Sequence, residues 1–322
     1  MLRTLFREIS LGVALLFSLV TYAQDYPNKP IKIIVSVPPG GSVDPMARLV
    51  GEKLRQKWGQ PVLVENRPGA SNNIGAEAVF RAPPDGYTLL FAPDAPFVIN
   101  KAFFRKLSYD PDALTPISLV AVNPQVLIVN PKVPAESMQQ LVAYAKGNPG
   151  KVAYGSAGSG TSTHLYGELF QSLAGIKLTH IPYKGAGAAV AGVIGGHVDM
   201  TFVDIGGALQ HIRSGAVRVL VIADHKRSAV LPDVPATSEM LPGLLARTWF
   251  GMAAPPKTPA AIVNRLSAAI AEALKQPDVV QRLVGMGNIE AVGSTPEEMA
   301  AFMRKDSERF AELIRATGAT EE

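Results

Sequence analysis

Residues 37–44 read VPPGGSVD and stand between an apolar run at 31–35 and a helical pattern at 45–59. A strand that ends in a glycine pair and continues as a helix is the opening of a βα unit. The rhythm continues, because short apolar, β-branched runs alternate with helical patterns along most of the chain. This alternation predicts an α/β fold built on mainly parallel sheets.

Composition places the chain among globular, exported proteins. It has 322 residues, of which 47% are hydrophobic and 18% charged, enough for two domains with buried cores. Its first 23 residues carry Arg3 and Arg7, then an apolar run at 11–20, then a small-x-small pattern that ends at Ala23. This arrangement predicts a secretory signal peptide that is cleaved near Ala23.

Charge and residue usage exclude several classes of function. The net charge is +4 and the charged residues are scattered along the chain, which argues against nucleic-acid binding. The absence of cysteine excludes disulfides, thiolate nucleophiles and cysteine-based metal sites. The five histidines show no paired spacing typical of zinc sites. We therefore expect neither a metal nor a cofactor.

The α/β rhythm changes at residues 119–131, LVAVNPQVLIVNP, where two apolar runs are split by Asn-Pro and a second set of units begins. A proline-rich piece at 231–259 then suggests a connection back to the first set. We predict one domain from residues 24–121 and 245–322, and a second domain from residues 122–244.

Two strand-to-helix turns could receive an anion: the first glycine loop, residues 39–44 (PGGSVD), and the second glycine loop, residues 155–163 (GSAGSGTST). Glycines let the backbone approach a ligand, and the free amides of the following helix point toward it. Neither loop has the lysine of a phosphate-binding loop or the glycine spacing of a dinucleotide fingerprint. A small carboxylate therefore remains as the expected ligand of these loops. The alternative is that each loop is only a tight turn with a helix cap. Asp44, which precedes Pro45, is the residue expected to cap.

Six longer stretches carry a resemblance to a known family: YPNKPIKIIVSVPPGGSVDPMARLV, VENRPGASNNIGAEAV, PPDGYTLLFAP, VAYGSAGSGTSTHLYGELF, HIPYKGAGAAVAGVIGGHVDM and TWFGMAAPPKTP. From Tyr26 to its C-terminus the chain resembles the Bug-type extracytoplasmic solute-binding receptors of tripartite tricarboxylate transport systems. The resemblance implies a type II periplasmic-binding-protein fold, with two α/β domains and a ligand cleft between them. It also implies a periplasmic monomer without enzymatic activity, which hands a small organic carboxylate to the membrane subunits of a secondary transporter.

The resemblance assigns a set of ligand-binding residues. In the family the ligand carboxylate lies between loops that match the two glycine loops here. We carry that role, together with the neighbouring strand ends, onto Gly40, Gly41, Ser42, Asp44, Asp94, Ala95, Ser156, Gly160, Thr161, Ser162, His164 and Asp204. For Asp44 a capping role, and for His164 a packing role, is the alternative.

Three positions depart from the family pattern. Val37 stands where the family often has an aromatic ring, and Ser36 stands where it often has proline. Loss of the ring would widen the pocket and remove a stacking surface. Asp94 would repel a second ligand carboxylate and suits an ammonium or hydroxyl group, unless its side chain faces solvent.

Two other functions remain as alternatives. One is a receptor that presents its ligand to a sensor, with the same binding chemistry. The other is an exported serine hydrolase that uses Ser156 or Ser159 with His164. Against the hydrolase, Ala157 stands where the nucleophile elbow needs a glycine.

Overall fold

The computed structural model describes residues 26–287 and 289–321, so the predicted signal peptide lies outside the described residues. The strands are β1 (Ile31–Val35), β2 (Val62–Asn66), β3 (Thr88–Pro93), β4 (Thr115–Val129), β5 (Ala153–Ser156), β6 (Thr179–Pro182), β7 (Met200–Asp204), β8 (Arg218–Ile222), β9 (Arg247–Ala254) and β10 (Glu290–Ala291). The helices are α2 (Val43–Trp58), α3 (Asn73–Phe80), α4 (Asn100–Phe103), α5 (Met138–Gly147), α6 (Ser162–Ala174), α7 (Ala186–Gly195), α8 (Ile205–Arg213), α9 (Ala260–Leu274), α10 (Pro277–Gly285) and α11 (Pro296–Thr317). The predicted α/β class is confirmed.

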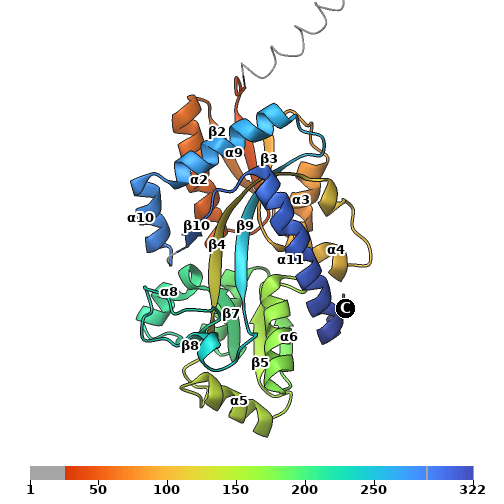
Figure 1. Cartoon of the computed structure of the whole chain (residues 1–322). Coiled ribbons are helices and arrows are strands. Elements are labelled where there is room, and N and C mark those ends of the chain that lie inside the picture. Colours follow the sequence, from red (N-terminus) through yellow and green to blue (C-terminus); the bar gives the residue numbers. More distant parts are fainter. Residues whose placement is uncertain (1–25, 288, 322) are drawn as a thin grey trace, which may run out of the picture.

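Lobe 1, the upper half of Figure 1, is a sheet in the order β2-β1-β3-β9-β4, with β10 also paired to β4. β1 pairs in parallel with both β2 and β3, as the βα rhythm predicts. Both faces of β1 are covered, because Ile31 and Ile33 pack with residues of α2 and α9, whereas Ile34 packs with α3. Helices on both faces explain why β1 has apolar side chains at every position except Lys32.

Lobe 2, the lower half of Figure 1, is a sheet in the order β4-β7-β5-β6, with β8 paired to β4. β5 is parallel to both β6 and β7. α6 covers one face of this sheet, and α7 and α8 cover the other. In both lobes the glycine loops therefore leave the carboxyl end of a parallel strand, where open α/β sheets bind ligands.

Two long strands belong to both lobes. β4 is a single 15-residue strand, whereas the sequence predicted two runs split at Asn123 and Pro124. β9 pairs with it from Thr115 to Pro124. On its other edge β4 pairs with β10 up to Val122 and with β7 from Gln125 onward. Pro124 is tolerated because it lies where this edge changes partners and no ladder hydrogen bond is required.

The boundaries that we predicted after residues 121 and 244 fall inside β4 and three residues before β9. They stay a prediction, since β4 runs through the first of them without a break.

α11 bridges the two lobes along one side of the molecule (Figure 1). It begins at the predicted capping box, in which Thr295 accepts from the amide of Glu298 and the Glu298 side chain accepts from the amide of Thr295. Asp306, on its buried face, accepts from Trp249 Nε1 at 2.7 Å in β9. Phe310 packs against Tyr166 of α6 in lobe 2, with 6.2 Å between ring centroids. The apolar stripe of Met299, Phe302, Phe310, Leu313 and Ile314 in the sequence predicts docking on the first domain, and the contact with α6 shows that the helix also packs on lobe 2.

Candidate functional site

The first glycine loop leaves its backbone open toward the other lobe. Gly40 has φ +107, a conformation that favours glycine, and an added side chain at Gly40 or Gly41 would meet no atom within 4 Å. Ser42 occupies the N-cap position of α2, yet its side chain makes no capping hydrogen bond. The first amides of α2 have no partners within the helix, and they are the donors that an anion would meet here.

Asp44 holds this loop in place and does not cap α2. It lies inside the first turn, and its carboxylate accepts two hydrogen bonds of 3.0 Å from Arg48 and one of 2.9 Å from Asn66. Asn66 also donates to the carbonyl of Val37 at 3.0 Å. The predicted capping role is therefore wrong, because α2 begins at Val43, two residues before the predicted start, and the Asp44 carboxylate is turned toward Asn66 of β2.

The second glycine loop is bonded to itself. The amides of Ala157, Gly158 and Gly160 donate to Thr163 Oγ1, Ser156 Oγ and His164 Nδ1, at 2.9, 3.1 and 3.2 Å. Thr161 Oγ1 donates to the carbonyl of Gly158 at 2.7 Å. These bonds use donors that a ligand would otherwise meet. Ser162 remains at the open end, where its hydroxyl is 3.3 Å from Thr248 Oγ1 of β9.

A stack of rings supports the second loop from behind. His180 lies between Tyr154 and His164, at centroid distances of 4.8 and 4.1 Å, and its Nε2 is 2.7 Å from Ser156 Oγ. Burial lowers the pKa of His164 to about 3, with the neighbouring His180 adding to the effect, and burial lowers the pKa of His180 to about 4. Both imidazoles are neutral at neutral pH, so this wall gives an anion no positive side chain.

The same stack bears on the hydrolase alternative. The structure pairs Ser156 with His180, whereas the alternative expected His164. Ser156 is fully buried and its hydroxyl also accepts from Gly158, and within residues 26–287 and 289–321 no carboxylate forms a hydrogen bond with His180. This geometry fixes the loop, and Ser156 lacks the accessibility that a hydrolase nucleophile needs.

The two lobes touch around the glycine loops. The Ser71 hydroxyl of lobe 1 donates to the carbonyl of Ser159 in the second glycine loop. A Cβ added at Gly185 would lie 2.7 Å from Pro38 Cγ, and one added at Gly187 would lie 3.2 Å from the carbonyl oxygen of Gly40. Glycines in lobe 2 thus permit the close approach of the first glycine loop.

A hollow of about 250 Å³ opens where the first glycine loop faces the start of α8. Its lining residues come from both lobes: Gly40, Gly41, Ser42, Pro45, Gly206, Gly207, Gln210, His211 and Met286. Asp204 caps α8 by accepting from the amide of Gly207 at 2.8 Å. Burial raises the pKa of Asp204, while Ser42 lies near enough to favour its charged form.

Farther in lies a set of buried polar side chains that we call the inter-lobe polar cluster. Among the described residues, these are the ones whose buried side-chain nitrogen or oxygen atoms lack a hydrogen-bond partner: Ser36, Ser42, Asp94, Asn100, Asn123 and Gln125. They come from the ends of β1 and β3, from the starts of α2 and α4, and from the crossing strand β4. Buried polar atoms without partners are rare and need an explanation, which a bound ligand would supply.

Contacts join this cluster to lobe 2. Gln125 Nε2 donates to Thr248 Oγ1 at 2.9 Å, and Thr248 in turn meets Ser162. Asp94 is fully buried at the end of β3, near enough to Ser162 for that hydroxyl to favour its charged form. Gln125 also pairs with Asp204 across β4 and β7.

The predicted site residues therefore divide into groups. Gly40, Gly41 and Ser42 line the hollow, Asp204 adjoins it, and Asp94 and Ser162 lie at the inter-lobe polar cluster. Ser156, Gly160, Thr161 and His164 make the internal bonds of the second glycine loop, Asp44 braces the first, and Ala95 begins a buried π-helical turn at Ala95–Ile99. Whether each contacts a ligand stays a prediction.

Sequence reasoning missed the contribution of β4 and β9. Asn123, Gln125 and Thr248 belong to stretches that were interpreted as connections between domains. The available signal was the pair of amide side chains in an otherwise apolar strand, Asn123 and Gln125, which lie on one face because side chains alternate.

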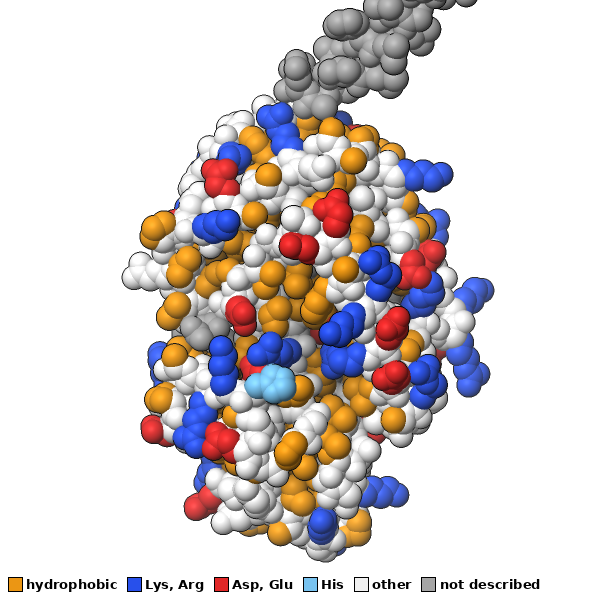
Figure 2. Space-filling view, viewed as in Figure 1, with side chains coloured by type: hydrophobic (Ala, Val, Ile, Leu, Met, Phe, Trp, Pro, Cys, Tyr) orange, Lys and Arg blue, Asp and Glu red, His pale blue; other side chains and the backbone are white. Residues whose placement is uncertain are grey.

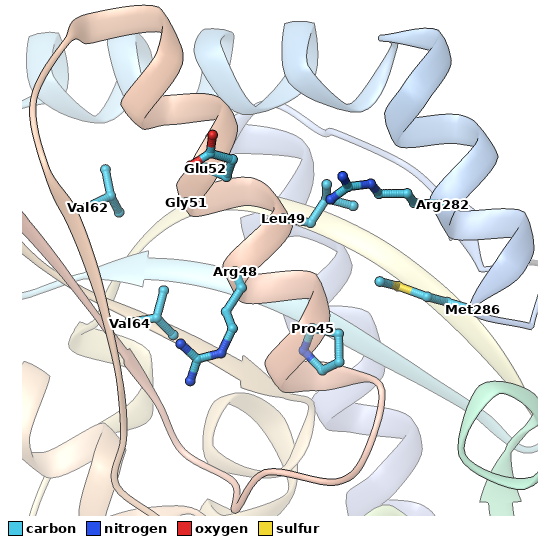
Figure 3. Close-up of a pocket in the computed structure, with 9 residues that line it drawn as sticks. All are labelled: Pro45, Arg48, Leu49, Gly51, Glu52, Val62, Val64, Arg282 and Met286. Carbon is cyan, nitrogen blue, oxygen red and sulfur yellow. The ribbon is translucent and has the colours of Figure 1, made fainter.

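A larger hollow of about 470 Å³ lies elsewhere in lobe 1, between α2, β2 and α10 (Figure 3). Arg48 and Arg282 enter it from different helices. Arg48 is already bonded to Asp44 and Asn66.

On the face of the molecule in Figure 2, acidic and basic side chains are interspersed, so this face has no broad field of one sign that would attract an anion.

Neither a membrane-spanning helix nor a metal site is found in the part of the chain that the structure describes. No helix within the described residues is both long and apolar enough to cross a membrane. In the same part of the chain, no group of three or more histidine or acidic side chains could hold a metal ion.

Comparison with known proteins places this geometry in a family. A model described as the tripartite tricarboxylate transporter family receptor matches residues 46–319. Protein BugT of Bordetella pertussis is 38% identical over 300 residues, which cover 92% of each chain. The structure of R. palustris Rpa4515 with adipate has a TM-score of 0.89 at 29% identity, and covers 92% of this chain and 99% of that one. MatC from Rhodopseudomonas palustris with bound malate has a TM-score of 0.84 at 31% identity, and covers 90% of this chain and 100% of that one.

These matches extend over nearly all of the described residues and agree with the two-lobed α/β architecture. The resemblance that the sequence motifs predicted is confirmed, and with it the two-domain solute-binding fold. The protein belongs to the receptor family of the tripartite tricarboxylate transporters.

Proposed function

We propose that this protein captures a small organic carboxylate between its two lobes and delivers it to the membrane subunits of a secondary transporter. The observation that carries the proposal is the inter-lobe polar cluster, whose buried polar atoms have no partners, next to the open amides of the first glycine loop. Relatives that bind adipate and malate support the ligand class.

The two glycine loops have different tasks in this proposal. Gly40, Gly41 and Ser42 offer donors directly to the carboxylate at the start of α2, and Ser162 adds a hydroxyl from the start of α6. Both helix N-termini favour negative charge. Ser156, Gly160, Thr161 and His164 act by holding the second loop in shape.

Closure of the lobes would couple binding to recognition. The proposed domains are residues 24–121 with 245–322, and residues 122–244, which are joined by β4 and β9. Bending of these two strands would separate the lobes, and the ligand would select the closed form by completing contacts from both sides. The closed form is then the shape that a membrane subunit recognises. In this proposal the receptor is a periplasmic monomer, exported by a signal peptide cleaved near Ala23.

Calorimetry and small-angle scattering against adipate, malate and other organic acids test the proposal. We expect at least one acid to bind and to reduce the radius of gyration. Gly41→Asp should abolish binding, because it places a negative charge in open space beside the donors, without strain or collision. Gly147→Asp, in equally open space at the end of α5, is the matched control and should bind normally.

The result that overturns the proposal is equally direct. If no acid binds and the protein does not compact, the receptor function is wrong. If Gly41→Asp binds as well as Gly147→Asp, the carboxylate does not use the first glycine loop. A role in presenting the ligand to a sensor would leave both measurements unchanged, and loss of uptake in cells that lack the membrane subunits separates the two roles.

A further inference from the structure

We propose that the ligand is a zwitterion, a carboxylate that also bears an ammonium group, and that Asp94 binds this ammonium. The inference rests on the proposed function and specifies the class of carboxylate. It follows from the position of Asp94, from the charges around it and from the kind of polar atom that is left without a partner beside it.

Asp94 is placed as a receptor group and not as a structural one. It follows β3 directly and stands at the N-cap position of the turn Ala95–Ile99, yet its side chain makes no capping hydrogen bond. The residue is 0% exposed, and neither carboxylate oxygen has a hydrogen-bond partner. The solvent-facing alternative that the sequence left open is therefore wrong. A buried carboxylate in this state is costly unless something else completes its bonds.

The neighbouring charges do not supply that partner. Arg309 is the nearby cation, but its Nε donates to Asp306 at 2.7 Å. Asp306 also accepts from Trp249, and the Tyr166 hydroxyl donates to the carbonyl of Arg247. Arg309, Asp306 and Tyr166 are thus already engaged, and the first two largely cancel in charge. The charge that Asp94 carries when ionised is therefore not neutralised by these neighbours, and a positive ligand group could neutralise it.

The rest of the inter-lobe polar cluster favours a donor in the same way. Besides the two oxygens of Asp94, the unpartnered atoms are three amide oxygens, one amide nitrogen and two hydroxyls: Asn100 Oδ1, Asn123 Oδ1, Gln125 Oε1, Asn123 Nδ2, Ser36 Oγ and Ser42 Oγ. Asn100 cannot present its amide nitrogen instead, because that nitrogen donates to the carbonyl of Ser71 at 2.8 Å. The amide oxygens only accept, as does an ionised Asp94, so they repel a second carboxylate and suit a group with several N–H donors. Asn123 Nδ2 and the two serine hydroxyls can instead donate to the ligand's own carboxylate.

Protonation gives the inference an independent signature. Burial raises the pKa of Asp94 to about 8, with the Asp306 carboxylate adding to the rise, against smaller opposing effects from Ser162, Arg309 and the backbone amide of Ala95. At neutral pH the empty site therefore holds a proton on Asp94. An ammonium favours the ionised carboxylate, so its binding at pH 7 should release a proton, whereas a dicarboxylate should leave the proton in place.

The experiment uses the mature protein and matched sets of probes: α- and ω-amino acids of three to six carbons, each with the dicarboxylate and the plain monocarboxylate of the same length. We expect at least one amino acid to bind about tenfold or more tightly than its dicarboxylate counterpart. Calorimetry at pH 7 in two buffers of different ionisation enthalpy should show the release of up to one proton for that amino acid.

Asp94→Asn tests the residue itself. It should weaken the amino acid by about tenfold or more, remove the proton release and leave the monocarboxylate unchanged. Asp278→Asn, on the surface of α10, is the control and should alter neither. The Asn variant should fold, and its melting temperature at pH 8 should not fall below that of the wild type, because it removes a buried charge.

Two failures are distinguishable. If dicarboxylates bind more tightly than amino acids and Asp94→Asn changes neither, the zwitterion inference is overturned while the receptor function stands. If none of the probes binds and none compacts the protein, the proposed function fails with it.

Discussion

The first and second glycine loops look alike in sequence but differ in how their hydrogen bonds are used. The first has open space at Gly40 and Gly41 and an unpartnered hydroxyl at Ser42. The second spends the amides of Ala157, Gly158 and Gly160 on its own side chains. A glycine-rich turn after a strand is therefore not by itself a receptor, because the side chains that follow it decide whether its donors remain free.

The comparison also assigns a division of labour across the cleft. The first loop has backbone amides that are not bonded within the loop, so these amides are available to a ligand in the proposed site. The second is a fixed wall, supported by the stacked rings of Tyr154, His180 and His164. Substitutions in the second loop should therefore affect stability, and substitutions in the first should affect binding.

The largest expected effect concerns the histidines behind the second loop and appears as the pH is lowered. The pKa values of His164 and His180, about 3 and about 4, lie below that of histidine in an unfolded chain. Between about pH 6.5 and pH 4 the unfolded state thus binds more protons, and stability present above pH 6.5 is lost as the pH falls. We expect the two histidines together to lower the free energy of unfolding, measured with urea, by about 2–4 kcal/mol between pH 7.5 and pH 5. Asp94 acts in the opposite direction over this range, because its raised pKa makes the folded state bind the extra proton, so the histidine contribution is read from the difference between the wild type and a histidine variant.

His180→Gln separates this effect from other titrations, because glutamine keeps a polar group toward Ser156 and cannot be protonated. As the pH is lowered from 7.5 to 5, the stability of this variant should fall less, or rise more, than that of the wild type. His225→Gln, at an exposed position, should retain the wild-type profile. Equal slopes in all three proteins would mean that the ring stack does not control the stability of the second loop.

The next effect compares one alanine in each loop. At Gly160 φ is +79, and an added Cβ would lie 2.6 Å from Phe103 Cδ1, whereas Gly41 has open space and no positive φ. Gly160→Ala should lower the free energy of unfolding by about 1–3 kcal/mol through backbone strain and collision. Gly41→Ala should change it by less than about 0.5 kcal/mol. Thermal and urea unfolding of both variants measure these changes. A similar loss of stability in the two variants would contradict the different roles of the two loops.

Much of this arrangement could be predicted from the sequence, because local patterns carry it. The apolar run at 31–35, the glycine pair and the capping box of Thr295 with Glu298 depend on neighbours along the chain, and each lies where its pattern predicted. The position of the first glycine loop at the end of a parallel strand followed from the βα rhythm.

What the sequence did not predict depends on contacts between distant segments. Asp44 has the pattern of a cap, but Asn66 of the next strand holds its carboxylate elsewhere. The contact between the Ser156 hydroxyl and His180 joins β5 to β6, and the sequence carries no pattern that indicates it. Gln125 and Thr248 meet only because β4 pairs with β9, and such pairing leaves no motif in either stretch.

The smallest expected effect concerns the hydrogen bond between Ser71 of lobe 1 and the second loop. Ser71 donates to the carbonyl of Ser159 across the lobes, and in the proposed opening of the lobes this bond would break. Ser71→Ala should leave the unfolding of the empty protein almost unchanged, since the open form does not use the bond. It should weaken ligand binding two- to fivefold, about 0.5–1 kcal/mol, as one neutral hydrogen bond predicts. The loss should appear mainly as faster ligand release in stopped-flow measurements, because opening precedes dissociation. If Ser71→Ala instead lowers stability without faster release, this contact belongs to the folded core, and the second loop is not a wall against which lobe 1 closes.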